Sequence, residues 1–134
     1  MYTGARLRRK REEAPMRVLI ADNQSRVRFA LWALLARQPG LELVGEASCA
    51  HDLLEQARAT GPDLLLLGWE LTGLEAASTL SALRETCPAL RVIALSGRAE
   101  ARQAALEAGA DVFVSKTHPP ERLLAAIGIR QNIT

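Results

Sequence analysis

The sequence is poor in aromatic residues and in cysteine. Only 4% of its 134 residues are Phe, Trp or Tyr, so a folded core has to be built mainly from Leu, Val, Ile and Ala. The two cysteines, Cys49 and Cys87, lie outside any Cys-x-x-Cys or His-rich pattern. This argues against a metal site and against a disulfide framework, and it favours a reducing compartment.

Long apolar runs are also missing. No segment approaches the ~18 apolar residues of a transmembrane helix, and no apolar stretch of the kind found in secretory signals follows the basic N-terminus. We therefore expect a cytoplasmic protein without a membrane partner. The sequence has no recognisable Ser/His/Asp or Cys/His arrangement, glycine-rich phosphate loop or pair of acid/base carboxylates. We accordingly expect no enzymatic activity.

Charge is distributed unevenly along the chain. Residues 1–15 carry five basic residues against two acidic ones, a net charge of +3, which leaves −1 for the rest of a chain whose total is +2. We predict a disordered basic extension over 1–15, a domain over 16–128 and a short tail over 129–134. Nucleic acid is expected to contact the chain only through the basic residues 6–11. The alternative is a solvated leader, or a start codon assigned upstream of Met16.

Short apolar runs alternate with helix-length amphipathic segments from Met16 onward. Five strands are predicted, over 17–21, 41–46, 63–67, 90–95 and 111–114, and five helices, over 25–38, 50–60, 74–86, 99–108 and 120–127. Continuous apolar runs such as Leu64–Leu67 are typical of parallel strands buried on both faces. The fold class is therefore α/β, a flavodoxin-like (βα)5 domain. It has a five-stranded parallel sheet in the order 2-1-3-4-5 with helices on both faces.

Polar residues and one glycine stand where these strands end. Asp22 and Asn23 follow the first strand, and Gly68 follows the apolar run of the third. Ser96 follows the fourth strand and Lys116 the fifth. Open parallel sheets bind ligands at the carboxyl ends of their strands, beside the point where the strand order reverses. Asp22, Asn23 and Gly68 flank this point, and they therefore predict a pocket there.

This set of residues resembles the receiver domain of two-component response regulators, over about residues 16–128. The Ala-Gly-Ala-Asp segment Ala108–Asp111 strengthens the resemblance, and Val44–Ala47 is similar to receivers of LuxR-type regulators. In that family the position of Gly68 is normally the aspartate that takes a phosphoryl group from a sensor histidine kinase. A second acidic residue normally stands where this chain has Asn23.

The resemblance implies a degenerate phosphorylation pocket without a catalytic residue. The site keeps one formal negative charge, on Asp22, of the three that the family offers magnesium, so we expect magnesium binding to be weak or absent and no other cofactor. Ser96 and Lys116 match the hydroxyl and ammonium that contact the phosphoryl group. From the residues alone, Lys116 can instead pair with Asp22, and Ser96 can cap the following helix. Phe113 matches the aromatic switch position of the family, and we expect it to stay inward.

The first helix also predicts a contact surface. Its apolar residues with the 3.6-residue period of a buried stripe are Val27, Leu31, Leu34 and Leu35. Phe29 and Trp32 fall off this stripe and neighbour each other on the outer face. Exposed aromatic pairs are strong interface anchors, so we predict that these two residues form a partner surface. The alternative is that the N-terminal extension covers them.

We therefore predict a stand-alone, phosphorylation-independent pseudo-receiver. It would act as a protein-interaction module in bacterial signal transduction or transcriptional regulation. Its partner would be a kinase, a regulator or a second copy of the chain, which would make a homodimer. Two alternatives stay open. One is a small-ligand or anion sensor that uses the vacated pocket, and the other is the receiver fragment of a DNA-binding response regulator.

Overall fold

The computed structural model of the chain describes residues 14–128. The predicted tail and all but the last two residues of the predicted basic extension lie outside these described residues. No helix within them is long and apolar enough to cross a membrane.

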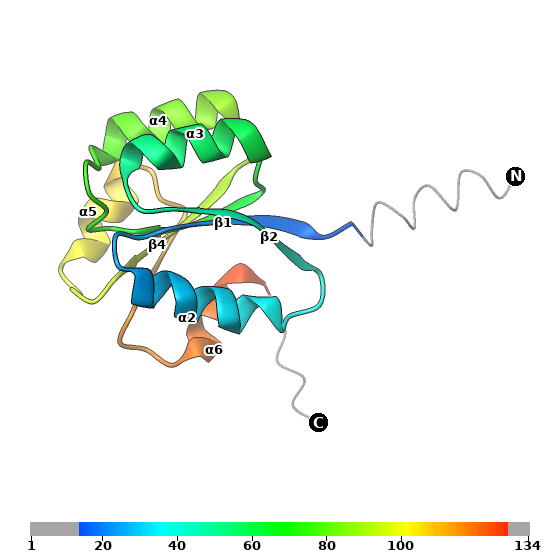
Figure 1. The fold of residues 1–134 in the computed structure, drawn as a ribbon. Coiled ribbons are helices and arrows are strands. Elements are labelled where there is room, and N and C mark those ends of the chain that lie inside the picture. The colour runs from blue at the N-terminus through cyan, green and yellow to red at the C-terminus, as the bar shows by residue number, and fades with distance from the viewer. Residues whose placement is uncertain (1–13, 129–134) are drawn as a thin grey trace, which may run out of the picture.

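Strands and helices alternate along the whole described chain (Figure 1). The strands are β1 (Met16–Ala21), β2 (Leu41–Ala47), β3 (Leu64–Gly68), β4 (Arg91–Ser96) and β5 (Val112–Ser115). The helices are α2 (Ser25–Ala36), α3 (Ala50–Thr60), α4 (Ala76–Thr86), α5 (Ala101–Ala108) and α6 (Pro120–Ile127). All strand pairs are parallel and the order is β2-β1-β3-β4-β5, which confirms the predicted flavodoxin-like topology.

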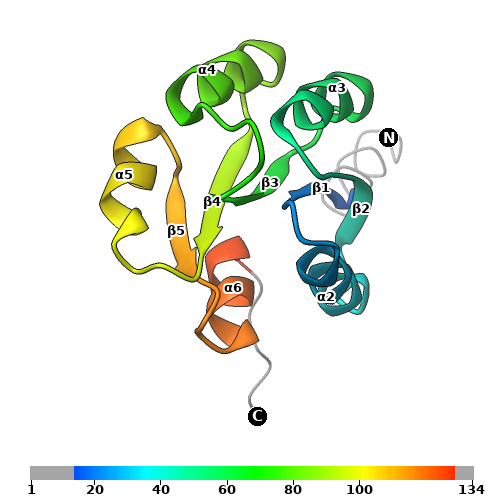
Figure 2. The same ribbon diagram turned by 60° about the vertical axis from the view of Figure 1, so that its left-hand side comes forward.

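Helices cover both faces of the sheet, with α3, α4 and α5 on one side and α2 and α6 on the other (Figures 1 and 2). The alternation of side chains along β3 divides its leucines between the two layers. Leu65 and Leu67 join the cluster that contains α3, α4 and α5 residues. Leu64 and Leu66 join the cluster that contains α2 and α6 residues. All four are at most 1% exposed, as expected for a central parallel strand.

The loops after β3 and β4 are each one residue longer than predicted, because α4 and α5 begin two residues later, and β3 and β4 end one residue later, than the sequence indicated. After β3, the backbone turns through Gly73 at φ +77°, a conformation that favours glycine. The turn is tied to the first residue of α3 by a hydrogen bond of 2.9 Å from the backbone N–H of Ala50 to the carbonyl of Thr72. These loops rise from the edge of the sheet where the predicted pocket lies.

Helix α2 is less buried than the predicted stripe implies. Leu35 is fully buried, whereas Val27, Leu31 and Leu34 are only half-buried. Phe29 is 77% exposed, in agreement with its predicted place on the outer face. Trp32 is less exposed than Phe29, because it is half-buried and packs against the cluster between the sheet and helices α2 and α6. Trp32 is more covered than predicted because α2 lies over β1 and β2, although it still lines a surface hollow together with Phe29. A partner surface at these two residues stays a prediction.

Candidate functional site

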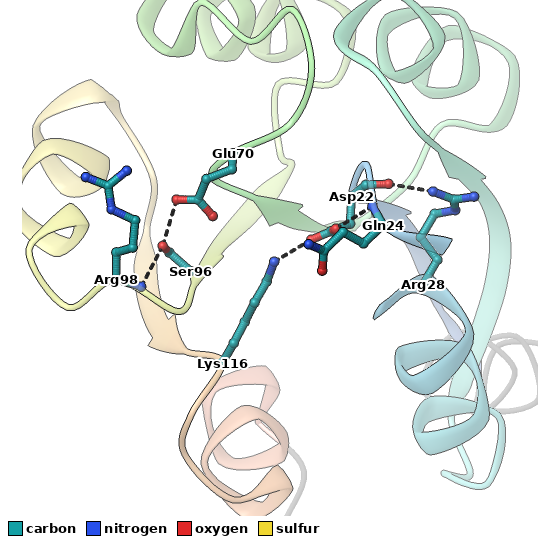
Figure 3. A network of polar contacts seen from close by, with 7 residues as sticks. All are labelled: Asp22, Gln24, Arg28, Glu70, Ser96, Arg98 and Lys116. Atoms are coloured by element: carbon teal, nitrogen blue, oxygen red, sulfur yellow. Dashed lines mark hydrogen bonds and ion pairs between the residues drawn. The ribbon is translucent and has the colours of Figure 1, made fainter. Parts of the chain in front are cut away.

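The fold brings four of the five predicted pocket positions to one edge of the sheet. Gly68 ends β3 opposite Leu95 of β4, and Ser96 ends β4 opposite Ser115 of β5. Asp22 directly follows β1 and Lys116 directly follows β5. Figure 3 shows Lys116 reaching across to Asp22, whereas the Ser96 hydroxyl is turned toward Glu70 and Arg98. Asn23 is exposed.

Asp22 and Lys116 form an ion pair across this edge. The Lys116 Nζ atom donates to Asp22 Oδ2 at 2.7 Å (Figure 3). The Asp22 side chain is 1% exposed and that of Lys116 is 25% exposed. The second carboxylate oxygen, Oδ1, accepts the backbone N–H of Gln24 at 2.9 Å. Of the two roles left open for Lys116, pairing with Asp22 is the one that the structure has.

Gly68 is the reason that Asp22 fits where it does. A Cβ atom built on Gly68 would overlap Asp22 Oδ2 and would lie 2.8 Å from Asp22 Cγ, well inside van der Waals contact. Gly68 does not have a positive φ, so its backbone conformation does not demand glycine. The missing side chain therefore provides space, and the Asp22 carboxylate fills it. The Asp22 carboxylate thus occupies space in the vacated pocket that a small-ligand or anion sensor would use.

Ser96 belongs to a second, separate network. Its hydroxyl donates to Glu70 Oε2 at 2.8 Å and accepts the backbone N–H of Arg98 at 3.0 Å (Figure 3). Helix α5 begins only at Ala101 and has no side-chain cap, so the predicted capping role of Ser96 is wrong. The hydroxyl instead holds the turn between β4 and α5. Sequence reasoning missed the bond to Glu70, because no periodic pattern extends from β3 into the loop that carries this residue.

The donors at this edge do not match what magnesium requires. Magnesium prefers hard oxygen ligands in near-octahedral geometry. Both carboxylate oxygens of Asp22 already accept hydrogen bonds, and Glu70 is bonded to the Ser96 hydroxyl. Within residues 14–128, no group of three His, Cys, Asp or Glu side chains is placed to hold a metal ion. The weak or absent magnesium binding expected from the sequence stays a prediction.

Phe113 lies in β5 and points into the core. It is 9% exposed and belongs to the cluster under α3, α4 and α5. Its inward position agrees with the prediction, whereas a role as a switch residue stays a prediction.

Two polar networks at the carboxyl edge of a five-stranded parallel sheet define the class of protein, a flavodoxin-like α/β domain with a site at the strand ends. Residues 18–128 match the model of the family described as the response regulator receiver domain. Because the match covers most of the sequence, the chain belongs to the receiver domain family of two-component response regulators.

Curated relatives are similar to this chain over most of its length. The nitrate/nitrite response regulator protein NarL of Escherichia coli K12 is 32% identical over 117 residues, which cover 86% of this chain and 54% of the relative. A protein-glutamate methylesterase/protein-glutamine glutaminase of Myxococcus xanthus is 37% identical over 106 residues, 77% of this chain and 30% of the relative. The chain thus spans about half or less of the length of these relatives.

Solved structures are similar in fold. A two-component response regulator of the LuxR family from Aurantimonas sp. SI85-9A1 superposes with a TM-score of 0.77 at 27% identity, covering 86% of this chain and 84% of that one. The signal receiver domain of the putative response regulator NarL from Mycobacterium tuberculosis gives 0.76 at 26% identity, covering 85% and 94%.

Proposed function

We propose that this receiver domain is a phosphorylation-independent protein-interaction module in bacterial signalling. The observation that carries the proposal is the placement of Asp22 in the space beside Gly68. By resemblance to the family, Gly68 stands at the acceptor position, and glycine offers no nucleophile. The neighbouring carboxylate of Asp22 is 1% exposed and paired with Lys116, so it is not presented to a phosphodonor.

The same ion pair supports a fixed rather than a switching domain. In the family, Lys116 and Ser96 match the groups that contact an incoming phosphoryl group. Here the Lys116 ammonium is paired with Asp22, and the Ser96 hydroxyl is bonded to Glu70. Both groups are thus occupied without phosphorylation. A sensor that binds an anion in this pocket is less well supported, because the ligand would have to displace the carboxylate of Asp22.

Phosphodonor assays test this proposal. The full chain is incubated with acetyl phosphate or beryllofluoride and magnesium, beside a receiver domain of established acceptor activity, and its mass and melting temperature are measured. We expect no mass gain and no change of melting temperature, since a ligand that binds the native state raises it. Stoichiometric aspartyl phosphate on this chain would refute the proposal.

A second candidate is the receiver part of a longer DNA-binding regulator. The length comparison favours it, because the chain covers only 54% of the NarL regulator of E. coli K12. The basic residues 6–11, the only expected nucleic-acid contacts of this chain itself, lie outside the described residues. A DNA mobility shift that weakens with salt and disappears on deletion of residues 1–15 would support DNA binding by this chain. A shift unchanged by the deletion would argue against a role for these residues.

A further inference from the structure

A surface hollow with a volume of about 500 Å³ lies between helix α2 and strand β2. It is lined by five residues of α2 and one of β2, namely Ser25, Arg26, Arg28, Phe29, Trp32 and Glu46. We call it the α2–β2 hollow. None of the five predicted pocket positions at the strand ends lines it. The hollow is therefore a different place on the molecule from the candidate functional site.

Two aromatic side chains form the apolar part of the hollow. Phe29 is 77% exposed, whereas Leu106, the other large apolar residue that is exposed within residues 14–128, is only 38% exposed. Trp32 comes three residues after Phe29, so the two side chains are neighbours on the surface of the helix. Trp32 also packs against the core cluster beneath α2. Because aromatic rings stack on other planar rings, the pair offers a binding surface for a planar group.

The side chain of Arg28 is held in one position. Its Nε atom donates to Glu46 Oε1 at 2.7 Å, and its Nη1 atom donates to the backbone carbonyl of Asp22 at 2.7 Å (Figure 3). The side chain is only 18% exposed. A planar guanidinium also stacks on aromatic rings. Since its contacts already exist, this part of the hollow does not have to be ordered when a ligand binds.

The hollow carries an excess positive charge on Arg26. Its lining has two arginines and one glutamate, and Glu46 is already paired with Arg28. Arg26 makes no ion pair within residues 14–128. It comes three residues before Phe29, so a ligand that stacks on Phe29 can reach its guanidinium. Guanidinium groups bind carboxylates and phosphates through two parallel hydrogen bonds. The charge of the lining therefore favours an anion.

The same charge disfavours a second copy of the chain as the occupant. A two-fold dimer brings the same surface of each copy against the other. Each α2–β2 hollow would then face another lining with an excess positive charge. Like charges that face each other across an interface oppose association.

We propose that the α2–β2 hollow binds a small planar aromatic anion, whose ring stacks on Phe29 and Trp32 and whose anionic group pairs with Arg26. A nucleoside monophosphate and an aromatic carboxylate both have this chemistry. The inference goes beyond the proposed function, because the ligand binds outside the strand-end site and no phosphoryl group is transferred. Inorganic phosphate and acetyl phosphate have no ring to stack, so we expect neither to be a ligand of this hollow.

Isothermal titration calorimetry of the full chain tests the chemistry of the ligand. The probes are AMP and 2-naphthoate, each compared at physiological salt with the uncharged molecule of the same ring, adenosine or 2-naphthamide, and with orthophosphate. We expect at least one of the two anions to bind about fivefold or more tightly than its uncharged counterpart, and orthophosphate not to bind. The anion that binds identifies the source of the ligand. The proposal would be overturned if neither anion bound at millimolar concentration, or if the uncharged molecules or orthophosphate bound equally well.

Two matched serine variants test the stacking surface. Phe29 and Leu106 are both exposed, but only Phe29 lines the hollow. Phe29→Ser should weaken binding of the anion by about tenfold, which is typical of losing one stacked ring, and Leu106→Ser by about twofold or less. Circular dichroism checks that both variants are folded. An equal loss in the two variants would show that the ligand does not stack on Phe29.

Two matched glutamine variants test the charge. Arg26 and Arg58 are both exposed helical arginines, but only Arg26 lines the hollow. Arg26→Gln should reduce the affinity for the anion to about that for its uncharged counterpart and leave the affinity for the uncharged molecule unchanged. Arg58→Gln should change neither affinity by more than about twofold. If Arg26→Gln weakened both molecules equally, Arg26 would not pair with the anionic group and the proposal would fail.

Sedimentation and the phosphodonor assay separate the remaining outcomes. A dimer of the free chain that Phe29→Ser dissociates would show that a second copy occupies the α2–β2 hollow, which overturns the proposal. Absence of anion binding together with absence of a mass gain from acetyl phosphate would refute the ligand and leave phosphorylation independence intact. Anion binding together with a mass gain would support the ligand and refute phosphorylation independence.

Discussion

Replacing Gly68 by alanine tests whether the space beside this residue is needed by Asp22. Gly68 is buried at the end of β3 and does not have a positive φ, so alanine can adopt its backbone conformation. On backbone grounds alone, removing glycine from a strand should stabilise the protein by roughly 0.5–1 kcal/mol. The added methyl group, however, would overlap the Asp22 carboxylate and lie 2.8 Å from its carbon atom.

The overlap is expected to outweigh the backbone gain. Overpacking of a buried site costs about 1–3 kcal/mol, and here relief requires Asp22 to leave a position in which it accepts bonds from Lys116 and from the Gln24 backbone. We expect Gly68→Ala to lower the free energy of unfolding by about 1–2 kcal/mol, after the backbone gain is subtracted.

A double-mutant cycle isolates this contact. Asp22→Ala removes both atoms that a methyl group on Gly68 would meet most closely. In that background, Gly68→Ala should be neutral or stabilising by up to ~1 kcal/mol, so the coupling free energy is about 2 kcal/mol. Gly97 is the matched control, because it too lacks a positive φ and a Cβ atom there would meet nothing within 4 Å. Gly97→Ala should not destabilise the protein.

Urea unfolding followed by tryptophan fluorescence provides the measurement. The free energies are compared at unchanged m values, so that a shift of the midpoint reports stability alone. If Gly68→Ala were as stable as the parent chain, or if its effect were the same with and without the Asp22 carboxylate, the reasoning about this space would be refuted.

Three other outcomes follow from burial and pairing. Lys116→Met should lower the free energy of unfolding by about 3 kcal/mol in urea titrations, because it leaves the buried carboxylate of Asp22 without its partner. Phe29→Ser should change the free energy of unfolding by less than about 0.5 kcal/mol, since the side chain is 77% exposed. Iodoacetamide should label Cys49 before Cys87 in the native protein, as peptide mass spectrometry would show. Cys87 is buried, and this burial raises the pKa of its thiol and so lowers its thiolate fraction at neutral pH.

Each of these outcomes has a control in the same chain. Glu42→Gln breaks an exposed ion pair with Arg17 and should cost less than about 1 kcal/mol, so an equal effect of Lys116→Met would contradict the argument from burial. Leu35→Ala, in the fully buried position of α2, should cost about 2–5 kcal/mol. If Phe29→Ser lowered the free energy of unfolding as much as Leu35→Ala, Phe29 would contribute to the stability of the fold rather than to a surface. In urea both cysteines should react at comparable rates, and faster native labelling of Cys87 would contradict the pKa argument.

Most of the fold could be predicted from the pattern of apolar runs in the sequence. Runs such as Leu64–Leu67 can only be satisfied by burial on both faces, and the connecting helices then leave few topologies. Helix starts after β3 and β4 were less predictable. The one extra residue in each loop leaves no trace in local periodicity. In the loop after β3, the backbone is held by a tertiary hydrogen bond from the Ala50 N–H to the Thr72 carbonyl. Trp32 is more covered than predicted, because the helical period alone does not tell how far a neighbouring strand covers the flank of a helix.

The sequence by itself determined the architecture and the positions of the site, because residues at the ends of parallel strands meet at one edge wherever the loops run. It also determined that position 68 has no side chain to offer. Only the tertiary structure decided what the missing side chain means. The space left by an absent side chain does not stay empty in a close-packed interior. The carboxylate of Asp22, from a neighbouring strand end, fills the space beside Gly68 and takes Lys116 as its partner, a contact between residues 94 positions apart.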